Sequence, residues 1–376
     1  MFWMILWIPL GFLAAVIALR MIGASYYQNY VAWESKNRHG LAYYGKPLAE
    51  RQAFKEKIRR RARFLLPLIW LEMKVQKKHL PVLSIEYQNI RGPRGTCTSE
   101  SFEAARRYQP TAQDIFVVTQ MKCGTTWMQQ IVYEILNHGN GDLSDQGHNH
   151  LYAVSPWIEA VDGVSMGKAP LIGKNRRRLI KTHLPAQLCP YDEKARYIYV
   201  TRDPVSCFAS IADFYQLMAG PLSPPRSEML DWFLSEEMWW GPWPLHAAGW
   251  WDRSKRQDNI LFLHFEEMKK DLKGIIRRVA EFLGEQLSED EVRKVEAKSA
   301  FHYMKANEDL FEMSPPNLHS VCGTYFKSGR TDRAKDLSPE EAGRIMGYCA
   351  GALKGRAYPF SKLYTPADRE KVRSLR

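Results

Sequence analysis

The stretch DIFVVTQMKCGTTWMQQIVYEIL, from Asp114 to Leu136, decides the fold of this chain. It begins as an apolar strand, turns at Gly124, and continues as a helix predicted to end near His138. Backbone N–H groups at such a helix start point toward an anion, and the helix dipole favours negative charge there. The Walker pattern G-x-x-x-x-G-K-[ST] is absent, because Lys122 precedes the glycine. Taken alone, the turn therefore predicts a phosphate-binding loop of another type, or simple packing of a strand on a helix.

Short apolar runs alternate with helical segments from residue 110 onward. The strand candidates are residues 115–119, 178–182, 196–201 and 260–265. One helix should begin at Asp203 and Pro204, and another should run from Glu266 to Leu283. This alternation predicts an α/β fold, a P-loop-like three-layer domain whose central parallel sheet is flanked by helices.

The N-terminal residues 1–19 form an uncharged apolar run, MFWMILWIPLGFLAAVIAL. About 20 apolar residues span a bilayer as a helix, so we expect an N-terminal transmembrane or membrane-associated helix. A cleaved signal peptide and a buried helix are the alternatives, although the basic start that a signal peptide would have is missing. The basic cluster Lys55–Arg63 follows, which predicts a single-pass membrane protein with its catalytic domain in the cytoplasm. Residues 64–71, FLLPLIWL, should be interfacial or packed on the domain.

Charge and cysteine content restrict the class of protein. The net charge is +12, and residues 20–107 carry 18 Lys and Arg against seven Asp and Glu. Residues 108–376 are almost neutral, so a nucleic-acid partner is not expected. The six cysteines have no C-x-x-C or zinc-type spacing, which predicts reduced thiols and no metal site. The predicted organisation is an anchor (1–22), a basic extension (23–109), a catalytic domain (110–364) and a C-terminal tail (365–376).

Two further segments carry polar groups at predicted strand ends. Lys181 and His183 are two residues apart in IKTHLP, so strand alternation places them on one side, and His183 is a candidate base. Arg202 ends another strand, and Ser210 follows eight residues later in a helix, where both could reach one anion. Each residue taken singly has a structural interpretation, as a capping arginine, a serine bonded within its helix or a structural histidine.

Together these segments resemble the sulfotransferases that use 3′-phosphoadenylyl sulfate (PAPS), particularly the cytosolic small-molecule type. MKCGTTW stands where the family has P-K-S-G-T-T-W, with Met121 and Cys123 in place of Pro and Ser. The family segment K-T-H-L-P is intact at residues 181–185. The Arg and Ser eight residues apart also match Arg202 and Ser210. These motifs occur in the family's order along the chain.

Later segments match the family less completely. GPWPLHAAGWWDRSKRQDNILFLHFEEMK resembles the Trp-rich helix and the next strand, with Phe265 where a tyrosine is usual. SAFHYMKAN, residues 299–307, is similar to T-S-F-x-x-M-K-x-N. The family's R-K-G-x-x-G-D-W-K is only partly matched by KSGRTDRAK at residues 327–335.

The resemblance implies transfer of a sulfuryl group from PAPS to a hydroxyl or amine of a small acceptor, and a membrane anchor would favour a lipophilic one. His183 would be the general base, and Lys122 and Lys181 would stabilise the leaving phosphate. The implied donor-binding residues are Lys122, Cys123, Gly124, Thr125, Thr126, Trp127, Arg202, Ser210, Phe265, Ser299, Phe301, Met304, Lys327, Ser328 and Gly329. No metal is expected. A P-loop kinase-like nucleotide enzyme and a non-catalytic membrane scaffold are the alternatives.

Overall fold

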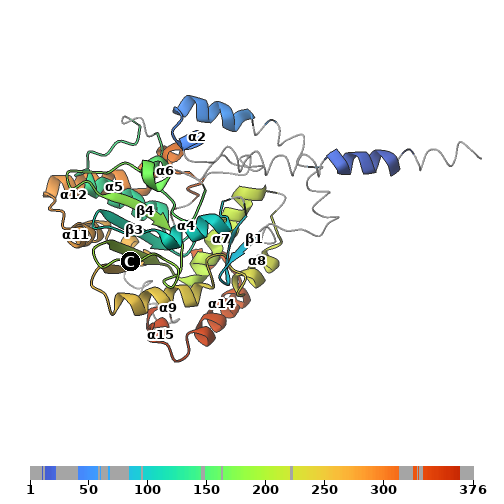
Figure 1. Ribbon diagram of the computed structural model, residues 1–376. Coiled ribbons are helices and arrows are strands. Elements are labelled where there is room, and N and C mark those ends of the chain that lie inside the picture. The colour runs from blue at the N-terminus through green and yellow to red at the C-terminus, as the bar shows by residue number, and fades with distance from the viewer. Residues whose placement is uncertain are drawn as a thin grey trace, which may run out of the picture.

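A four-stranded parallel sheet forms the centre of the molecule, with strand order β4-β3-β5-β6 (Figure 1). In the computed structural model, the described residues are 11, 13–22, 41–57, 60, 67, 84–94, 96–144, 149–161, 164–220, 223–312, 325–327, 329 and 333–364. The central strands are β3 (Asp114–Thr119), β4 (Arg178–Thr182), β5 (Arg196–Thr201) and β6 (Ile260–His264). A separate antiparallel hairpin contains β1 (Ser84–Tyr87) and β2 (Ile90–Pro93). The predicted α/β fold with a central parallel sheet is confirmed.

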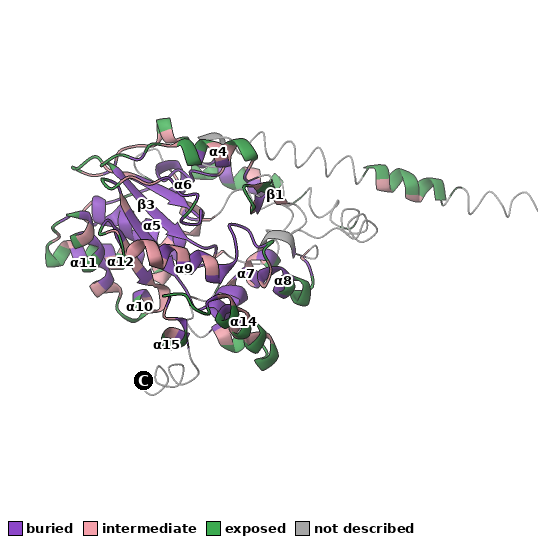
Figure 2. Ribbon diagram, turned by 60° about the horizontal axis from the view of Figure 1, so that its bottom comes forward, coloured by how far each residue is buried: buried purple, intermediate pink, exposed green. Residues whose placement is uncertain are grey.

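Both faces of the sheet are buried, as Figure 2 shows. Alternate residues of β3 enter two separate cores, with Ile115 and Val117 in one and Phe116 and Val118 in the other. The first face is covered by α5 (Thr125–Leu136), α11 (Leu272–Leu283) and α12 (Glu289–Ser299). The second face is covered by α7 (Pro204–Ala219), α9 (Trp243–Ser254) and α14 (Pro339–Ala352). Because all four strands are parallel, their carboxyl ends meet at one edge, where α/β proteins bind ligands.

The single helix predicted from Glu266 to Leu283 is wrong. The chain forms α10 (Phe265–Lys270) and α11, separated by Asp271 with φ −143° and ψ 76°. The Asp271 carboxylate accepts a hydrogen bond from the Gly274 N–H at 2.8 Å. Asp271 therefore caps a new helix instead of continuing the old one.

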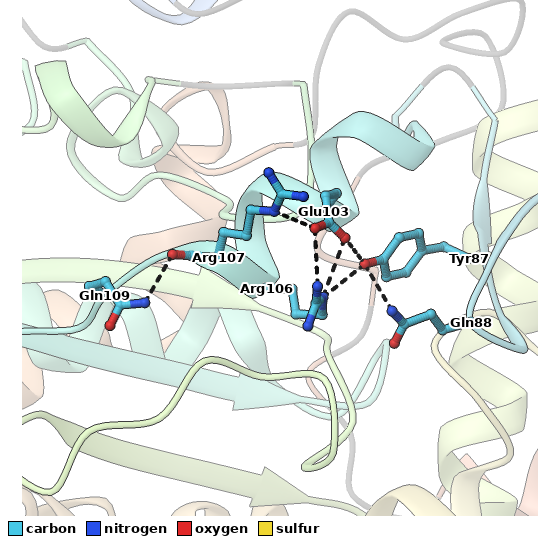
Figure 3. Close-up of polar contacts among 6 residues, drawn as sticks. All are labelled: Tyr87, Gln88, Glu103, Arg106, Arg107 and Gln109. Atoms are coloured by element: carbon cyan, nitrogen blue, oxygen red, sulfur yellow. Dashed lines mark hydrogen bonds and ion pairs between the residues drawn. The ribbon is translucent and has the colours of Figure 1, made fainter.

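The hairpin is fixed to α4 (Ser99–Arg107) by stacking and by a surface polar cluster (Figure 3). The rings of Tyr87 and Phe102 stack with their centres 5.6 Å apart. The Glu103 carboxylate accepts hydrogen bonds from Tyr87, Arg106 and Arg107. Hydrogen bonds from Arg106 and then Tyr87 lower the pKa of Glu103 to about 2. Because exposed ion pairs contribute little, the buried Phe102 ring is the main attachment.

An N-terminal segment packs on the domain beside α6 (Leu151–Val154), as Figure 1 shows. It contains α2 (Leu41–Tyr44) and the helical residues 48–57, and we call residues 41–57 the strap. The remaining elements are η2 (Met166–Lys168), α8 (Arg226–Phe233), α13 (Phe301–Ala306), η4 (Glu308–Leu310), η5 (Arg333–Asp336) and α15 (Phe360–Tyr364).

The predicted single-pass membrane location is corrected by the structure. Among the residues described, no helix combines the length and apolar character needed to cross a bilayer. Of the apolar run, residues 1–10 and 12 lie outside the described part, whereas residues 11 and 13–19 are helical. The interfacial segment predicted at residues 64–71 also lies outside it, apart from residue 67.

Candidate functional site

The loop between β3 and α5 has the backbone form of an anion-binding turn. Lys122 has φ 63° and Gly124 has φ 103°, both in the left-handed region. A Cβ atom on Gly124 would lie 2.8 Å from Cδ2 of Phe265, so only glycine fits there. Gly124 is also the N-cap of α5 and offers no side chain to its first N–H groups. The helix start is therefore available to an anion.

His183 lies at the end of β4 beside this loop. Its Nδ1 atom is 2.8 Å from the carbonyl oxygen of Thr119, at the end of β3. A carbonyl only accepts hydrogen bonds, so Nδ1 carries the hydrogen and Nε2 is the basic atom of the neutral ring. Burial, followed by the positive charge of Lys181, lowers the pKa of His183 well below 6.5. The imidazole is consequently neutral and can accept a proton.

A buried carboxylate holds the turn that carries His183. Glu159 accepts the His183 backbone N–H at 2.7 Å and the Thr182 hydroxyl at 2.9 Å. Burial raises the pKa of Glu159. From the other side, His246 Nε2 donates to the His183 carbonyl oxygen at 2.9 Å. The backbone of His183 is thus fixed by both of its polar groups.

Lys181 lies in an aromatic cage next to His183. Its ammonium donates to the Tyr152 hydroxyl at 2.9 Å and lies 3.4 Å from the centre of the Trp157 ring. The His183 ring lies 5.2 Å from Trp157 and 4.6 Å from Trp240, centre to centre. Two aromatic side chains therefore border the candidate base.

Arg202 follows β5 and contacts the loop from the third strand end. It is 6% exposed, and its Nη1 donates to the Lys122 carbonyl oxygen at 3.2 Å. Its guanidinium carbon lies 4.4 Å from the centre of the Phe265 ring. The Nε atom is buried without a hydrogen-bond partner among the described residues. Ser210 lies on α7, the helix that follows Arg202.

Lys122 is the cation within the loop itself. Its ammonium lies 4.5 Å from the centre of the Phe214 ring and 5.0 Å from that of Tyr325. Burial and the charge of Arg202 lower the pKa of Lys122 to about 8. An anion bound at the loop would relieve this repulsion.

Aromatic residues gather where α5 meets α10 and α12. Trp127 Nε1 donates to the Ser299 carbonyl oxygen at 2.8 Å, and its ring meets the Phe265 ring edge-on at 5.4 Å. The Ser299 hydroxyl is buried and, among the described residues, has no partner. The Phe301 ring approaches Gly329, whose Cβ position would be 2.7 Å away. Met304 is buried in the core of the α5 face.

The C-terminal segment of the predicted site is only partly described. Lys327 forms an ion pair at 2.8 Å with Asp213 of α7, and Arg333 contacts the same carboxylate. Gly329 has φ 58°, whereas Ser328 lies outside the described residues. Asp213 and Arg333 were not predicted as site residues, because Arg333 lies in the incompletely matched segment 327–335 at a position with no assigned role, and Asp213 matches no position of a motif.

The thiols near the loop are free. Cys123 and Cys207 lie 3.7 Å apart between sulfur atoms, and both are buried. Cys189 and Cys349 are likewise outside any disulfide, and Cys322 lies outside the described residues. In the described part of the chain, no group of three or more His, Cys, Asp or Glu could hold a metal ion.

Comparison with known proteins identifies the family. A family profile described as Sulfotransferase domain matches residues 112–355, well over half of the chain. The chain therefore belongs to the sulfotransferase family, which its motifs resembled. The match lies within the predicted domain 110–364, whose bounds stay a prediction.

Individual relatives agree with this assignment. The chain is 35% identical to mouse Sulfotransferase 2B1 over 227 residues, 59% of this chain and 65% of that protein. It thus spans just under two thirds of that relative. It is 32% identical to rat Sulfotransferase 1 family member D1 over 234 residues, 61% of this chain and 78% of that protein.

Solved structures share the fold. Mouse sulfotransferase SULT7A1 complexed with PAP has a TM-score of 0.58 and 22% identity, covering 78% of this chain and 99% of its own. Retinol dehydratase in complex with retinol and PAP has a TM-score of 0.60 and 20% identity, with 76% and 96% covered. At these identities the likeness concerns the fold.

Proposed function

We propose that this protein transfers the sulfuryl group of PAPS to a hydroxyl or amine of a small acceptor, with His183 as general base. The observation that carries the proposal is the convergence of three strand ends. The loop after β3 brings Lys122, β4 brings Lys181 and His183, and the end of β5 is followed by Arg202. Three cations suit a polyanionic donor, and one neutral base suits an acceptor group that must lose a proton.

Several of the predicted donor-binding residues have polar groups without hydrogen-bond partners, which PAPS could fill. Arg202 Nε and Ser299 Oγ are buried without described partners, and none of the described side chains caps α5. The helix start would hold the 5′-phosphate, and Arg202 with Ser210 would hold the 3′-phosphate. Trp127, with Phe265 and Phe301, offers ring faces for the adenine.

The chemical step is an in-line displacement. PAPS supplies an activated sulfuryl group when it is bound. A new S–O or S–N bond to the acceptor forms while the bond from sulfur to the 5′-phosphate oxygen breaks. His183 Nε2 takes the acceptor proton, and Lys122 and Lys181 stabilise the charge that develops on the leaving phosphate.

The acceptor side favours a molecule with an apolar body. The rings of Trp157 and Trp240 border His183, and an aromatic wall gains most from a desolvated hydrocarbon surface. The retinol dehydratase structures contain retinol or androsterone, both lipophilic, which supports the same acceptor class here.

The test is sulfuryl transfer from PAPS to a panel of alcohols, phenols and amines. His183→Ala should lower kcat by about 10²- to 10⁴-fold, the usual contribution of a positioned base. Its affinity for adenosine 3′,5′-bisphosphate (PAP) should stay unchanged. The proposal would be contradicted if the wild-type protein sulfated none of the acceptors in the panel, or if the variant kept full activity. EDTA should have no effect, whereas a metal-dependent reaction with ATP would favour a kinase.

A further inference from the structure

The strap lies outside the matched family region and packs on a helix next to the candidate site. Residues 41–57 precede the matched region 112–355, yet Tyr44 is only 1% exposed. Its ring centre lies 4.5 Å from that of His150 and 5.2 Å from that of Tyr152. Figure 1 shows this segment lying beside α6. The strap therefore packs directly on the helix that carries Tyr152.

Two buried cations anchor the strap. Arg51 is fully buried and donates from Nη1 to the Asp309 carbonyl oxygen at 2.6 Å and from Nη2 to that of Asn149. Lys55 is paired with the carboxylates of Asp309 and Glu312. Loss of one partner of a buried pair leaves an uncompensated charge, so this attachment is specific.

Tyr152 connects the strap to the proposed catalytic lysine. Its hydroxyl accepts the 2.9 Å hydrogen bond from Lys181, and its ring stacks between those of His150 and Trp157, with centres 5.3 and 6.5 Å away. Both the ring and the hydroxyl of Tyr152 thus lie in a fixed environment.

The segment after α6 also holds the Lys181 main chain. The Lys181 N–H donates to the Pro156 carbonyl oxygen at 2.8 Å, and the Ile158 N–H donates to the Lys181 carbonyl oxygen at 3.1 Å. One short segment therefore sets both the backbone of Lys181 and its ammonium.

We propose that Tyr152 is a positioning residue for Lys181, and that the strap holds Tyr152 through Tyr44. The inference rests on the proposed function, in which Lys181 stabilises the leaving phosphate. A lysine ammonium ends a flexible four-carbon stem, so a fixed acceptor is needed to aim it. Misplacement by a fraction of an ångström mainly affects the transition state. The effect should therefore appear in kcat and not in donor binding.

The direct test is Tyr152→Phe, which keeps the ring and removes the hydroxyl. Loss of a hydrogen bond to a charged group should lower kcat about tenfold. The KM for PAPS and the affinity for PAP should stay within about twofold, because this bond does not hold the donor. Tyr43→Phe is the matched control, since it removes a hydroxyl from the same aromatic group but keeps the ring that meets Tyr44 and Phe54. An unchanged kcat in Tyr152→Phe would overturn the inference.

A double-mutant cycle tests the strap. Tyr44→Leu should lower kcat about fivefold in the wild-type background, a size typical of the interaction energy between contacting residues. In the Tyr152→Phe background the same substitution should lower kcat little further. Tyr44→Phe, which retains the ring, should restore kcat and shows that Tyr44→Leu acts through packing. Losses that simply multiply in the double variant would overturn the role of the strap.

Lys181→Met separates this inference from the proposed function. If it lowers kcat strongly while Tyr152→Phe does not, only the positioning role of Tyr152 fails. If Lys181→Met retains wild-type kcat, the proposed role of Lys181 fails, and the inference fails with it.

Discussion

Gly124→Ala tests the backbone form on which the donor loop depends. Gly124 has φ 103°, and its Cβ position lies 2.8 Å from Cδ2 of Phe265. Two costs follow from this geometry. An L-residue in the left-handed region is strained by about 1–2 kcal/mol, and forcing a side chain aside in a packed site costs about 1–3 kcal/mol. We therefore expect the free energy of unfolding to fall by about 2–5 kcal/mol.

The same change should weaken donor binding. The Phe265 ring touches Trp127 at 5.4 Å and lies under the Arg202 guanidinium at 4.4 Å, so moving it disturbs both. Urea unfolding measures the loss of stability, and calorimetry with PAP measures the loss of affinity. Phe265→Leu combined with Gly124→Ala should recover the steric part of the stability loss and leave the backbone part.

Gly347→Ala is the matched control for Gly124→Ala. Gly347 lies inside α14, where an added Cβ meets nothing within 4 Å. Alanine should therefore stabilise the protein by about 0.5–1 kcal/mol, since it is the better helix former. If Gly124→Ala unfolds like the wild type and binds PAP within twofold, the reasoning is refuted.

Three further predictions concern the reacting groups. Glu159→Gln should lower kcat/KM about 10- to 100-fold, because it weakens charged hydrogen bonds to the His183 N–H and the Thr182 hydroxyl; steady-state rates equal to wild type would contradict this. The pH profile of kcat/KM should show no break near 6.5, because the lowered pKa of His183 keeps the ring of the free enzyme neutral until more acidic pH; a break near 6.5 would show an exposed, ordinary histidine. Lys122, whose pKa is lowered to about 8 by burial and by Arg202, should lose its charge as pH rises above that value. Affinity for PAP should therefore fall toward pH 9.5 in wild type but not in Lys122→Arg, and parallel curves would refute the assignment.

The sheet and the loop could be predicted because their signals are local. All four central strands lie within one residue of the predicted ranges, since buried parallel strands are short apolar runs. The turn around Gly124 was also predictable from its sequence alone. The break at Asp271 was not, because a cap in mid-helix looks like an ordinary polar residue.

The partners of the candidate site residues could not be predicted from the sequence. Glu159 and Tyr152 belong to a segment without a motif, and they meet Thr182, His183 and Lys181 only after folding. From the sequence, residues 41–57 (the strap) were predicted to belong to a basic extension, because no local pattern shows that Arg51 will be buried. A buried carboxylate or arginine becomes recognisable only through its distant partners.

Titration calorimetry with PAP is the most direct test of the proposed donor site. The account predicts micromolar binding that EDTA leaves unchanged, that exceeds the affinity for ATP, and that Arg202→Ala abolishes. Absence of binding, or a metal-dependent preference for ATP, would contradict it.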